Sequence, residues 1–190
     1  MSRIIAGRVG SLRLGTAANV TRPTSDRVKE SLFSSLESLD VLSGARVLDL
    51  FAGTAALGLE AISRGAASLV AVEKLKAAAL VCKKNIELVQ NALAKQQVQA
   101  EVQLITKDAE SFLKSNNSEF DLVLIDPPYE MTNQKLTEVS QLLSGSLAKD
   151  ALVVVERSSR LEMPELFGLE LQSQKSYGDT SVYFFRVSAQ

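Results

Sequence analysis

The residues best suited to chemistry follow an apolar run, in the stretch VLIDPPYE over residues 123–130. Asp126 comes directly before two prolines, each of which fixes its own φ angle and restricts the residue before it. Because the corner is rigid, the Asp126 carboxylate and the Pro127 carbonyl can face one point and accept both hydrogens of an exocyclic amine. Pro128 completes the corner, and Tyr129 offers a ring on which a flat base could stack. The alternative is a tight turn with a surface tyrosine.

Two other strand-like segments also end in groups that suit a ligand. DLFAGTAALG contains Gly53, and a glycine turn between a strand and a helix lets the backbone approach a ligand. It matches neither GxGxxG nor GxxxxGK[ST], which argues against a dinucleotide dehydrogenase and a P-loop NTPase. Glu73 lies twenty residues after Gly53, where a carboxylate can accept hydrogen bonds from both hydroxyls of a ribose. The alternative is a surface glutamate.

A further strand-like segment leads into TKDAESFL. Asp108 is suited to cap the helix that follows it, and it could equally meet an adenine amine at the same edge of the sheet. The two roles are compatible. Together with the glycine turn and Glu73, this segment indicates an adenosine ligand.

The absence of histidine from the 190 residues excludes several kinds of catalytic site. Ser-His-Asp and Cys-His nucleophiles and every histidine-ligated zinc or iron site are ruled out, and no acidic loop resembles an EF-hand. A metal bound by oxygen ligands alone is the alternative to our expectation that the site holds no metal. The single Cys82 excludes an internal disulfide, and no apolar run reaches the roughly 18–20 residues of a membrane helix. The start is also too weakly apolar for a signal peptide, so we expect a cytoplasmic protein.

Charge is unevenly distributed along the chain. The net charge is −1, but residues 1–30 hold six Arg and Lys residues against two acids and carry +4, which leaves −5 on the other 160 residues. A basic arm on a mildly acidic body is typical of a surface that contacts phosphates; an ordinary solvated N-terminus is the alternative. The candidates for RNA contact in this arm are its five arginines, Arg3, Arg8, Arg13, Arg22 and Arg27.

The elements that must position these groups alternate between strand and helix. After a hairpin in the first fifteen residues and a helical stripe from Ser25, strands are predicted at ARVLDLF, SLVAVE, AEVQLI, FDLVLI and ALVVVE, with helices between them. The longest helix is predicted from about Leu75 to Lys95, and two strands around a Gly-Asp turn close the chain. This alternation predicts an α/β fold with a parallel sheet, in which ligands bind outside the carboxyl ends of the strands. We expect one domain over residues 1–190, with an arm over 1–23 and a catalytic core over 24–190.

Together these motifs resemble those of the class I S-adenosylmethionine-dependent methyltransferases. DPPY resembles the motif of their amino-methylating members, and DLFAG resembles their motif I. Almost end to end, the sequence is similar to the RsmD family of 16S ribosomal RNA guanine-N2 methyltransferases, through RIIAG, RPTSDRVKESLF, DLFAGTAALGLEA, DPPY and YGDTSV. The resemblance implies these cofactor-binding residues: Asp49, Phe51, Ala52, Gly53, Glu73, Asp108 and Ala109.

The resemblance also implies a fold and an activity. The fold is a Rossmann-like, mostly parallel seven-stranded sheet with an antiparallel last strand, and a small basic N-terminal hairpin near the RNA. The activity is methyl transfer from S-adenosylmethionine to N2 of one guanine in 16S rRNA, within the 30S subunit or a late intermediate, by a monomeric enzyme. Catalysis would rest on Asp126, Pro127, Pro128 and Tyr129.

The sequence departs from the family pattern at two places. Ala55 stands where the family usually has glycine, and alanine costs roughly 1–2 kcal/mol if φ is positive there and little if φ is negative. The hairpin carries only Arg8 and Arg13 after IIAG, where the family usually has a richer basic and aromatic run.

Two other functions remain open at this level. DPPY also suits methylation of adenine N6 or cytosine N4 in DNA, although 190 residues leave no separate target-recognition domain. Ala55 and the thin basic hairpin could instead mark a degenerate methyltransferase fold that only binds RNA or a ribosomal protein. The intact DPPY and Glu73 argue against this second alternative.

Overall fold

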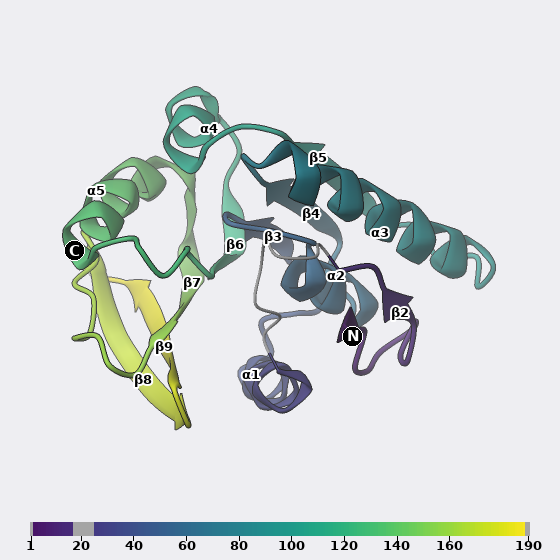
Figure 1. Cartoon of the computed structure of the whole chain (residues 1–190), viewed down its shortest axis with the longest axis horizontal. Coiled ribbons are helices and arrows are strands. Elements are labelled where there is room, and N and C mark those ends of the chain that lie inside the picture. Colours follow the sequence, from purple (N-terminus) through teal and green to yellow (C-terminus); the bar gives the residue numbers. More distant parts are fainter. Residues whose placement is uncertain (1, 17–24, 189–190) are drawn as a thin grey trace.

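A seven-stranded sheet forms the centre of the molecule (Figure 1). The fold is known from a computed structural model that describes residues 2–16 and 25–188. The strands of the sheet are β3 (Arg46–Asp49), β4 (Ser68–Val72), β5 (Glu101–Ile105), β6 (Phe120–Ile125), β7 (Leu147–Ser158), β8 (Leu169–Tyr177) and β9 (Thr180–Val187). The helices are α1 (Asp26–Ser38), α2 (Ala56–Ser63), α3 (Lys76–Ala94), α4 (Ala109–Ser115) and α5 (Asn133–Leu143), with a 3-10 turn over Ser144–Ser146.

The strand order is β5-β4-β3-β6-β7-β9-β8. The strands from β5 to β7 pair in parallel, whereas β9 pairs antiparallel with both β7 and β8. This confirms the predicted α/β fold with a mostly parallel sheet and an antiparallel last strand. The last strand, β9, lies between β7 and β8. A tight turn at Gly178 and Asp179 joins it to β8, so these two strands pair as a hairpin.

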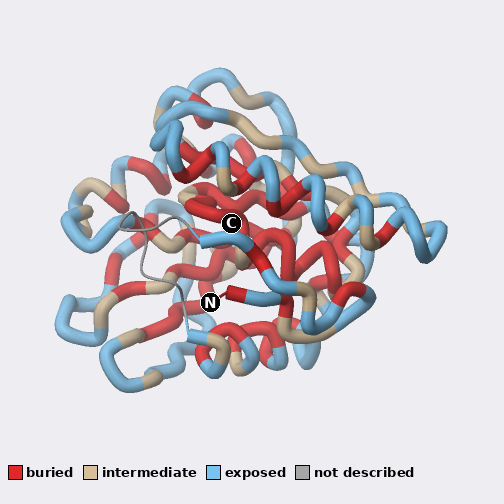
Figure 2. Tube along the Cα trace, turned by 45° about the vertical axis from the view of Figure 1, so that its right-hand side comes forward, coloured by how far each residue is buried: buried red, intermediate tan, exposed pale blue. Residues whose placement is uncertain are grey.

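Two apolar cores lie on opposite faces of the sheet. One core joins residues of α1, α2 and α3 to alternate residues of the strands, such as Val47 and Leu124. The other joins α4 and α5 to the intervening strand residues, such as Leu48 and Val123. Figure 2 shows these buried segments in the middle of the molecule, with exposed segments around them. Because both faces are covered, the central strands are apolar throughout, as parallel strands usually are.

The helix ends follow the local signals in the sequence. The hydroxyl of Ser25 accepts a hydrogen bond from the Val28 N–H and caps α1, and the carboxylate of Asp108 accepts one from the Ser111 N–H at 2.8 Å and caps α4. After α2, Gly65 has a φ of 111°, which glycine adopts without strain.

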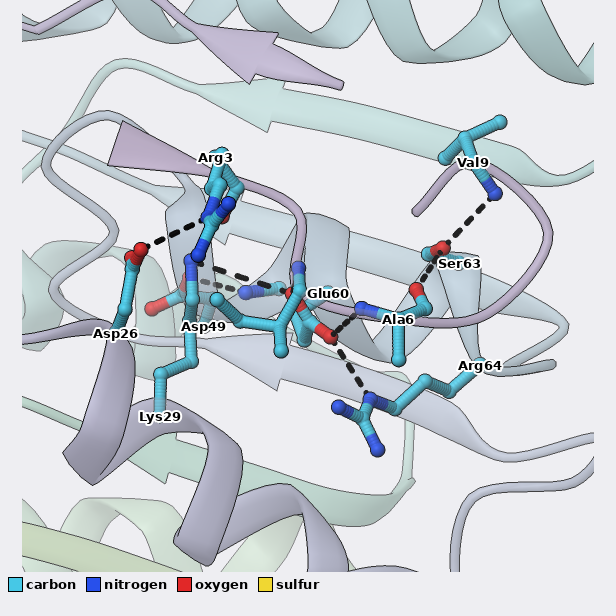
Figure 3. Close-up of polar contacts among 11 residues, drawn as sticks. Arg3, Ala6, Val9, Asp26, Lys29, Asp49, Glu60, Ser63 and Arg64 are labelled. Atoms are coloured by element: carbon cyan, nitrogen blue, oxygen red, sulfur yellow. Dashed lines mark hydrogen bonds and ion pairs between the residues drawn. The ribbon is translucent and has the colours of Figure 1, made fainter. Parts of the chain in front are cut away.

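The N-terminal hairpin is small and packs against the core. Its strands are β1 (Ser2–Arg3) and β2 (Arg13–Leu14), which pair antiparallel. The Glu60 carboxylate on α2 accepts hydrogen bonds from the N–H groups of Ile5 at 2.6 Å and Ala6 at 3.0 Å. Farther along α2, Ser63 bonds the hairpin again, donating to the Ala6 carbonyl at 2.6 Å and accepting from the Val9 N–H at 3.1 Å (Figure 3).

A buried charge cluster holds this docking in place. Glu60 is fully buried, and its carboxylate faces the Arg64 Nε at 2.8 Å and the Lys29 Nζ at 4.0 Å. Lys29 of α1 is 1 % exposed and donates to the Arg3 carbonyl. Burial lowers the pKa of Lys29, an effect that Glu60 and Asp26 oppose. The cluster therefore joins β1, α1 and α2, three segments that are distant in sequence (Figure 3).

Across residues 2–16 and 25–188, no helix is long and apolar enough to cross a membrane.

Candidate active site

The predicted catalytic and cofactor-binding residues lie at or near the carboxyl ends of β3, β4, β5 and β6. β3 has β4 on one side and β6 on the other, so the strand order reverses between β3 and β6. Such a switch point leaves a crevice at the carboxyl ends of parallel strands, where α/β proteins bind their ligands. Backbone hydrogen bonds continue across this edge from Leu50 N to Leu124 O at 3.0 Å and from Ala52 N to Val72 O at 2.9 Å. The turn after β3 is thereby fixed between the ends of β4 and β6.

Glu73 connects the glycine turn to the start of α3. Its carboxylate accepts hydrogen bonds from the Gly53 N–H at 2.8 Å and the Leu75 N–H at 2.6 Å, one on each oxygen. An ionised carboxylate has about four acceptor positions, so each oxygen keeps one for a ligand. These two acceptor positions fit the two adjacent hydroxyls of a ribose, although the residue is only 9 % exposed.

The glycine turn contains two residues with a positive φ, on either side of Thr54. Gly53 has a φ of 54° and Ala55 has a φ of 60°. Ala55 is fully buried, and its N–H donates to the Ala52 carbonyl at 2.6 Å. Because φ is positive at Ala55, alanine is strained at this position. A residue with a Cβ is less stable in the left-handed region by roughly 1–2 kcal/mol.

Asp49 lies beneath the turn, out of contact with solvent. It is 2 % exposed, and its carboxylate accepts a hydrogen bond from the Gly58 N–H at 3.0 Å. Burial raises the pKa of Asp49 to about 7, and the bond from Gly58 only partly offsets this. Burial also raises the pKa of the Cys82 thiol, to about 12, with smaller effects from Asp49 and Glu73. Phe51 is half-buried and Ala52 is buried.

Asp108 occupies the edge of the site beyond β5. Its carboxylate is exposed, and hydrogen bonding to Ser111 holds the pKa of Asp108 below its usual range. Ala109, the first residue of α4, is buried beside it. The capping role is thus confirmed, and the role at an adenine amine stays a prediction.

The DPPY corner follows β6 directly. Asp126 is half-buried, Pro127 is buried, and Pro128 and Tyr129 are exposed. The Pro128 carbonyl accepts a hydrogen bond from the Met131 N–H at 2.9 Å, which closes a turn. The Tyr129 side chain is 61 % exposed, so its ring is available to a base from outside the protein.

Comparisons with known proteins agree with this geometry. A family profile described as "Conserved hypothetical protein 95" matches residues 2–186. The ribosomal RNA small subunit methyltransferase D of Escherichia coli (strain K12) is 33% identical over 172 residues, which is 89% of this chain and 81% of that protein. The chain belongs to the RsmD family of methyltransferases.

Solved structures show the same fold. The Escherichia coli protein yhhF, named as a candidate methyltransferase, superposes with a TM-score of 0.81 at 31% identity, over 100% of this chain and 99% of that one. SMU.776, a candidate methyltransferase in complex with SAH, has a TM-score of 0.60 at 15% identity, over 77% of this chain and 46% of that one. The second comparison, at 15% identity, supports the fold alone.

Arg157 is a residue of this RsmD-family site that the sequence analysis missed. It ends the buried part of β7 and is 4 % exposed. Its Nη2 donates to the Met131 carbonyl at 2.7 Å and to the Asn133 Oδ1 at 3.2 Å, and its Nε has no hydrogen-bond partner among the described residues. Burial lowers the pKa of Arg157, and the nearby Tyr183 and Asp126 oppose that effect. Arg157 therefore anchors the loop that leaves the DPPY corner, but a lone arginine after a strand gives no signal of this role.

The arginines predicted to contact RNA lie in different surroundings. Arg3 is exposed but forms an ion pair with Asp26 at 2.8 Å. Arg8, Arg13 and Arg27 are exposed, and Arg22 lies outside the described residues. Lys29, which contributed to the basic count of the arm, is buried against Glu60 and adds no charge to the surface.

Proposed function

We propose that this chain transfers a methyl group from S-adenosylmethionine to the exocyclic N2 of a guanine in 16S rRNA, acting as a monomer on the 30S subunit or a late intermediate. The observation that carries the proposal is the position of the Asp126–Pro127 corner, next to the glycine turn at the switch point of the sheet. The name of the Escherichia coli relative supports ribosomal RNA of the small subunit as the substrate class.

The cofactor would occupy the crevice between the turn after β3 and the end of β4. Glu73 would accept both ribose hydroxyls, Asp108 would accept the adenine amine, and the backbone around Gly53 would approach the remainder. When bound, the cofactor supplies a methyl group already activated by a sulfonium. The protein must then position the acceptor nitrogen and exclude water.

Asp126 and Pro127 would orient the target amine. Guanine N2 is a weak nucleophile, because its lone pair is delocalised into the ring. If the Asp126 carboxylate and the Pro127 carbonyl each accept one N–H, the nitrogen becomes more pyramidal and its lone pair points toward the methyl group. The methylated nitrogen is strongly acidic, so a carboxylate or water can take its proton.

The target base would have to leave its stack to reach this point. The exposed ring of Tyr129 is placed to hold such a base, with a stacking contribution of roughly 1–3 kcal/mol. Arg157 would support this step indirectly, because it fixes the loop at Met131 and Asn133.

The proposal is tested by offering the enzyme four acceptors with radiolabelled S-adenosylmethionine: unmethylated 30S particles, fully methylated 30S particles, naked 16S rRNA and duplex DNA. We expect transfer to the unmethylated particles, with N2-methylguanosine as the product after digestion to nucleosides. Transfer to DNA would support the amino-methylation of adenine or cytosine instead. Binding of the particles without transfer to any acceptor would support a degenerate, RNA-binding protein.

A further inference from the structure

The hairpin lies along one side of α3. Gly15 and Asn85 exchange two hydrogen bonds, from Gly15 N to Asn85 Oδ1 at 2.8 Å and from Asn85 Nδ2 to Gly15 O at 3.1 Å. Just beyond the C-terminus of α3, Gln96 Nε2 donates to the Arg8 carbonyl at 2.7 Å. Asn85 and Gln96 are 11 residues apart, or about 16 Å along a helix. The hairpin therefore lies along the C-terminal half of α3 (Figure 1).

The chain around α3 is strongly basic. Residues 74–95 contain five lysines and a single acid, Glu87, and carry +4, as do residues 1–30, so the other 138 residues carry −9. Of the first segment, the hairpin over residues 2–16 carries Arg3, Arg8 and Arg13, and its docking brings this part of the chain beside the second segment, which is far away in sequence. The five lysines of this segment are all exposed: Lys74, Lys76, Lys83, Lys84 and Lys95. Within the described ranges, none of them forms an ion pair, and neither does Arg8 or Arg13 of the hairpin.

The lysines of α3 divide into two sides of the helix. Each residue turns about 100° around the axis, and Lys84 and Lys95 each precede a residue that bonds the hairpin. Since they are 11 residues apart, they point in nearly the same direction, beside the hairpin. Lys83 and Lys76 are seven residues apart and share another direction, with Lys83 about 160° away from Asn85. Lys84 and Lys95 thus flank the hairpin, and Lys76 and Lys83 face away from it.

We propose that Lys84 and Lys95 of α3, together with Arg8 and Arg13 of the hairpin, form one surface that binds RNA phosphates. This inference rests on the proposed function and names how its substrate is held. Such a surface explains how a hairpin with only two unpaired arginines, Arg8 and Arg13, can serve as an RNA-binding arm. The lysines of α3 supply the additional positive charges. Glu60, Ser63, Asn85 and Gln96 fix the hairpin, so the surface is rigid before RNA arrives.

Lys84→Glu and Lys83→Glu are a matched pair for the test. Both residues are exposed, both lie in the middle of α3, and Glu87 is within one turn of each. Equilibrium binding of each variant to unmethylated 30S particles is measured at several KCl concentrations and fixed Mg²⁺. For Lys84→Glu we expect binding about tenfold weaker and a log K against log salt slope shallower by about 1. For Lys83→Glu we expect affinity within about twofold of wild type, because exposed charges farther than about 8–10 Å away are screened.

Lys95 requires a milder change, because it caps the C-terminus of α3, where an acid opposes the helix dipole. Lys95→Gln should weaken binding in the same direction as Lys84→Glu. Thermal unfolding and cofactor affinity, both expected to match wild type, confirm that each variant is folded. Equal losses from Lys83→Glu and Lys84→Glu, or no loss from either, would overturn the surface. Because the readout is binding, it remains decisive even if no methyl transfer is detected.

Discussion

At the scale of single residues, the site depends on a few side chains that each hold a strand end in place. Glu73 bonds the turn after β3 with one oxygen and the start of α3 with the other. The buried Asp49 carboxylate accepts a hydrogen bond from the Gly58 N–H at the start of α2, next to the same turn. Within the turn, Ala55 adopts a left-handed backbone conformation. The consequence is a turn held between the strand ends by hydrogen bonds, whose properties can be changed one residue at a time.

Replacing Glu73 by alanine should weaken cofactor binding. The change removes the proposed acceptor of two ribose hydroxyls, and hydrogen bonds to a charged group contribute about 1.5–3 kcal/mol each. We expect the dissociation constant of S-adenosylmethionine, measured by calorimetry, to rise roughly tenfold or more. Since the change also frees the Gly53 and Leu75 N–H groups, thermal unfolding must show that the variant is folded at the assay temperature. An unchanged dissociation constant would contradict the ribose assignment.

Replacing Ala55 by glycine should stabilise the protein. The φ of 60° strains an alanine and not a glycine, but glycine has more freedom in the unfolded chain, so we expect a net gain of about 0.5–1 kcal/mol. Urea unfolding measures the difference. The control is Ala56→Gly at the first residue of α2, where φ is helical and glycine can only lower stability. A loss of stability in Ala55→Gly would show that its methyl group contributes more through packing than it costs in strain.

Asp49 should make the free energy of unfolding depend on pH. Its pKa rises from 3.8 to about 7 on folding, so between these values the unfolded chain has released a proton that the folded chain retains. Stability should therefore fall as pH rises from about 4 to about 7, by up to about 4 kcal/mol. The carboxyl groups of Asp108 and Asp121 have lowered pKa values and act below this range. In Asp49→Asn the decline should flatten, and an unaltered pH profile would refute the assignment.

At the scale of elements, the contact between the hairpin and α2 decides how the basic arm is presented. The sequence predicts the hairpin, α1 and α2 separately, but nothing in it pairs Glu60 with Lys29 or with the Ile5 N–H, because these groups meet only in the folded chain. Two of the segments that carry the family resemblance also meet. The hydroxyl oxygens of Ser31 on α1 and Tyr177 on β8 lie 2.6 Å apart. The hairpin is held to α2 by Glu60 and Ser63, and α1 is joined to β8 by the contact between Ser31 and Tyr177.

Glu60→Ala should be far more destabilising than Lys29→Met. Glu60→Ala leaves Lys29 buried without its counter-charge and frees two N–H groups, a loss of about 3–5 kcal/mol. Lys29→Met keeps a similar volume, and Glu60 retains Arg64 and both N–H groups, so we expect about 1–2 kcal/mol. Urea unfolding compares the two variants, and hydrogen exchange at Ile5 and Ala6 shows whether the hairpin detaches first. Equal losses would mean that Glu60 does not organise the cluster.

At the scale of the whole molecule, alternating strand and helix patterns predict the sheet, and polar residues at strand ends predict the edge that carries the site. Asp126, Glu73 and Asp108 are found there because parallel strands place their carboxyl ends together. The sequence does not predict Arg157, since its partners at Met131 and Asn133 follow a different strand. Nor does it separate the lysines of α3, because their surroundings depend on a hairpin more than sixty residues earlier in the chain. The positive φ of Ala55 is likewise a property of the folded turn.

In the proposed mechanism the Asp126 carboxylate directs the target amine toward the methyl group. Single-turnover transfer to unmethylated 30S particles by Asp126→Ala, with wild type in parallel and cofactor affinity measured on both, tests it most directly. We expect an unchanged cofactor dissociation constant and a methyl-transfer rate lower by roughly 10²–10⁴-fold, the range for removal of a positioned acid–base group. Transfer at the wild-type rate by Asp126→Ala would remove Asp126 from the mechanism.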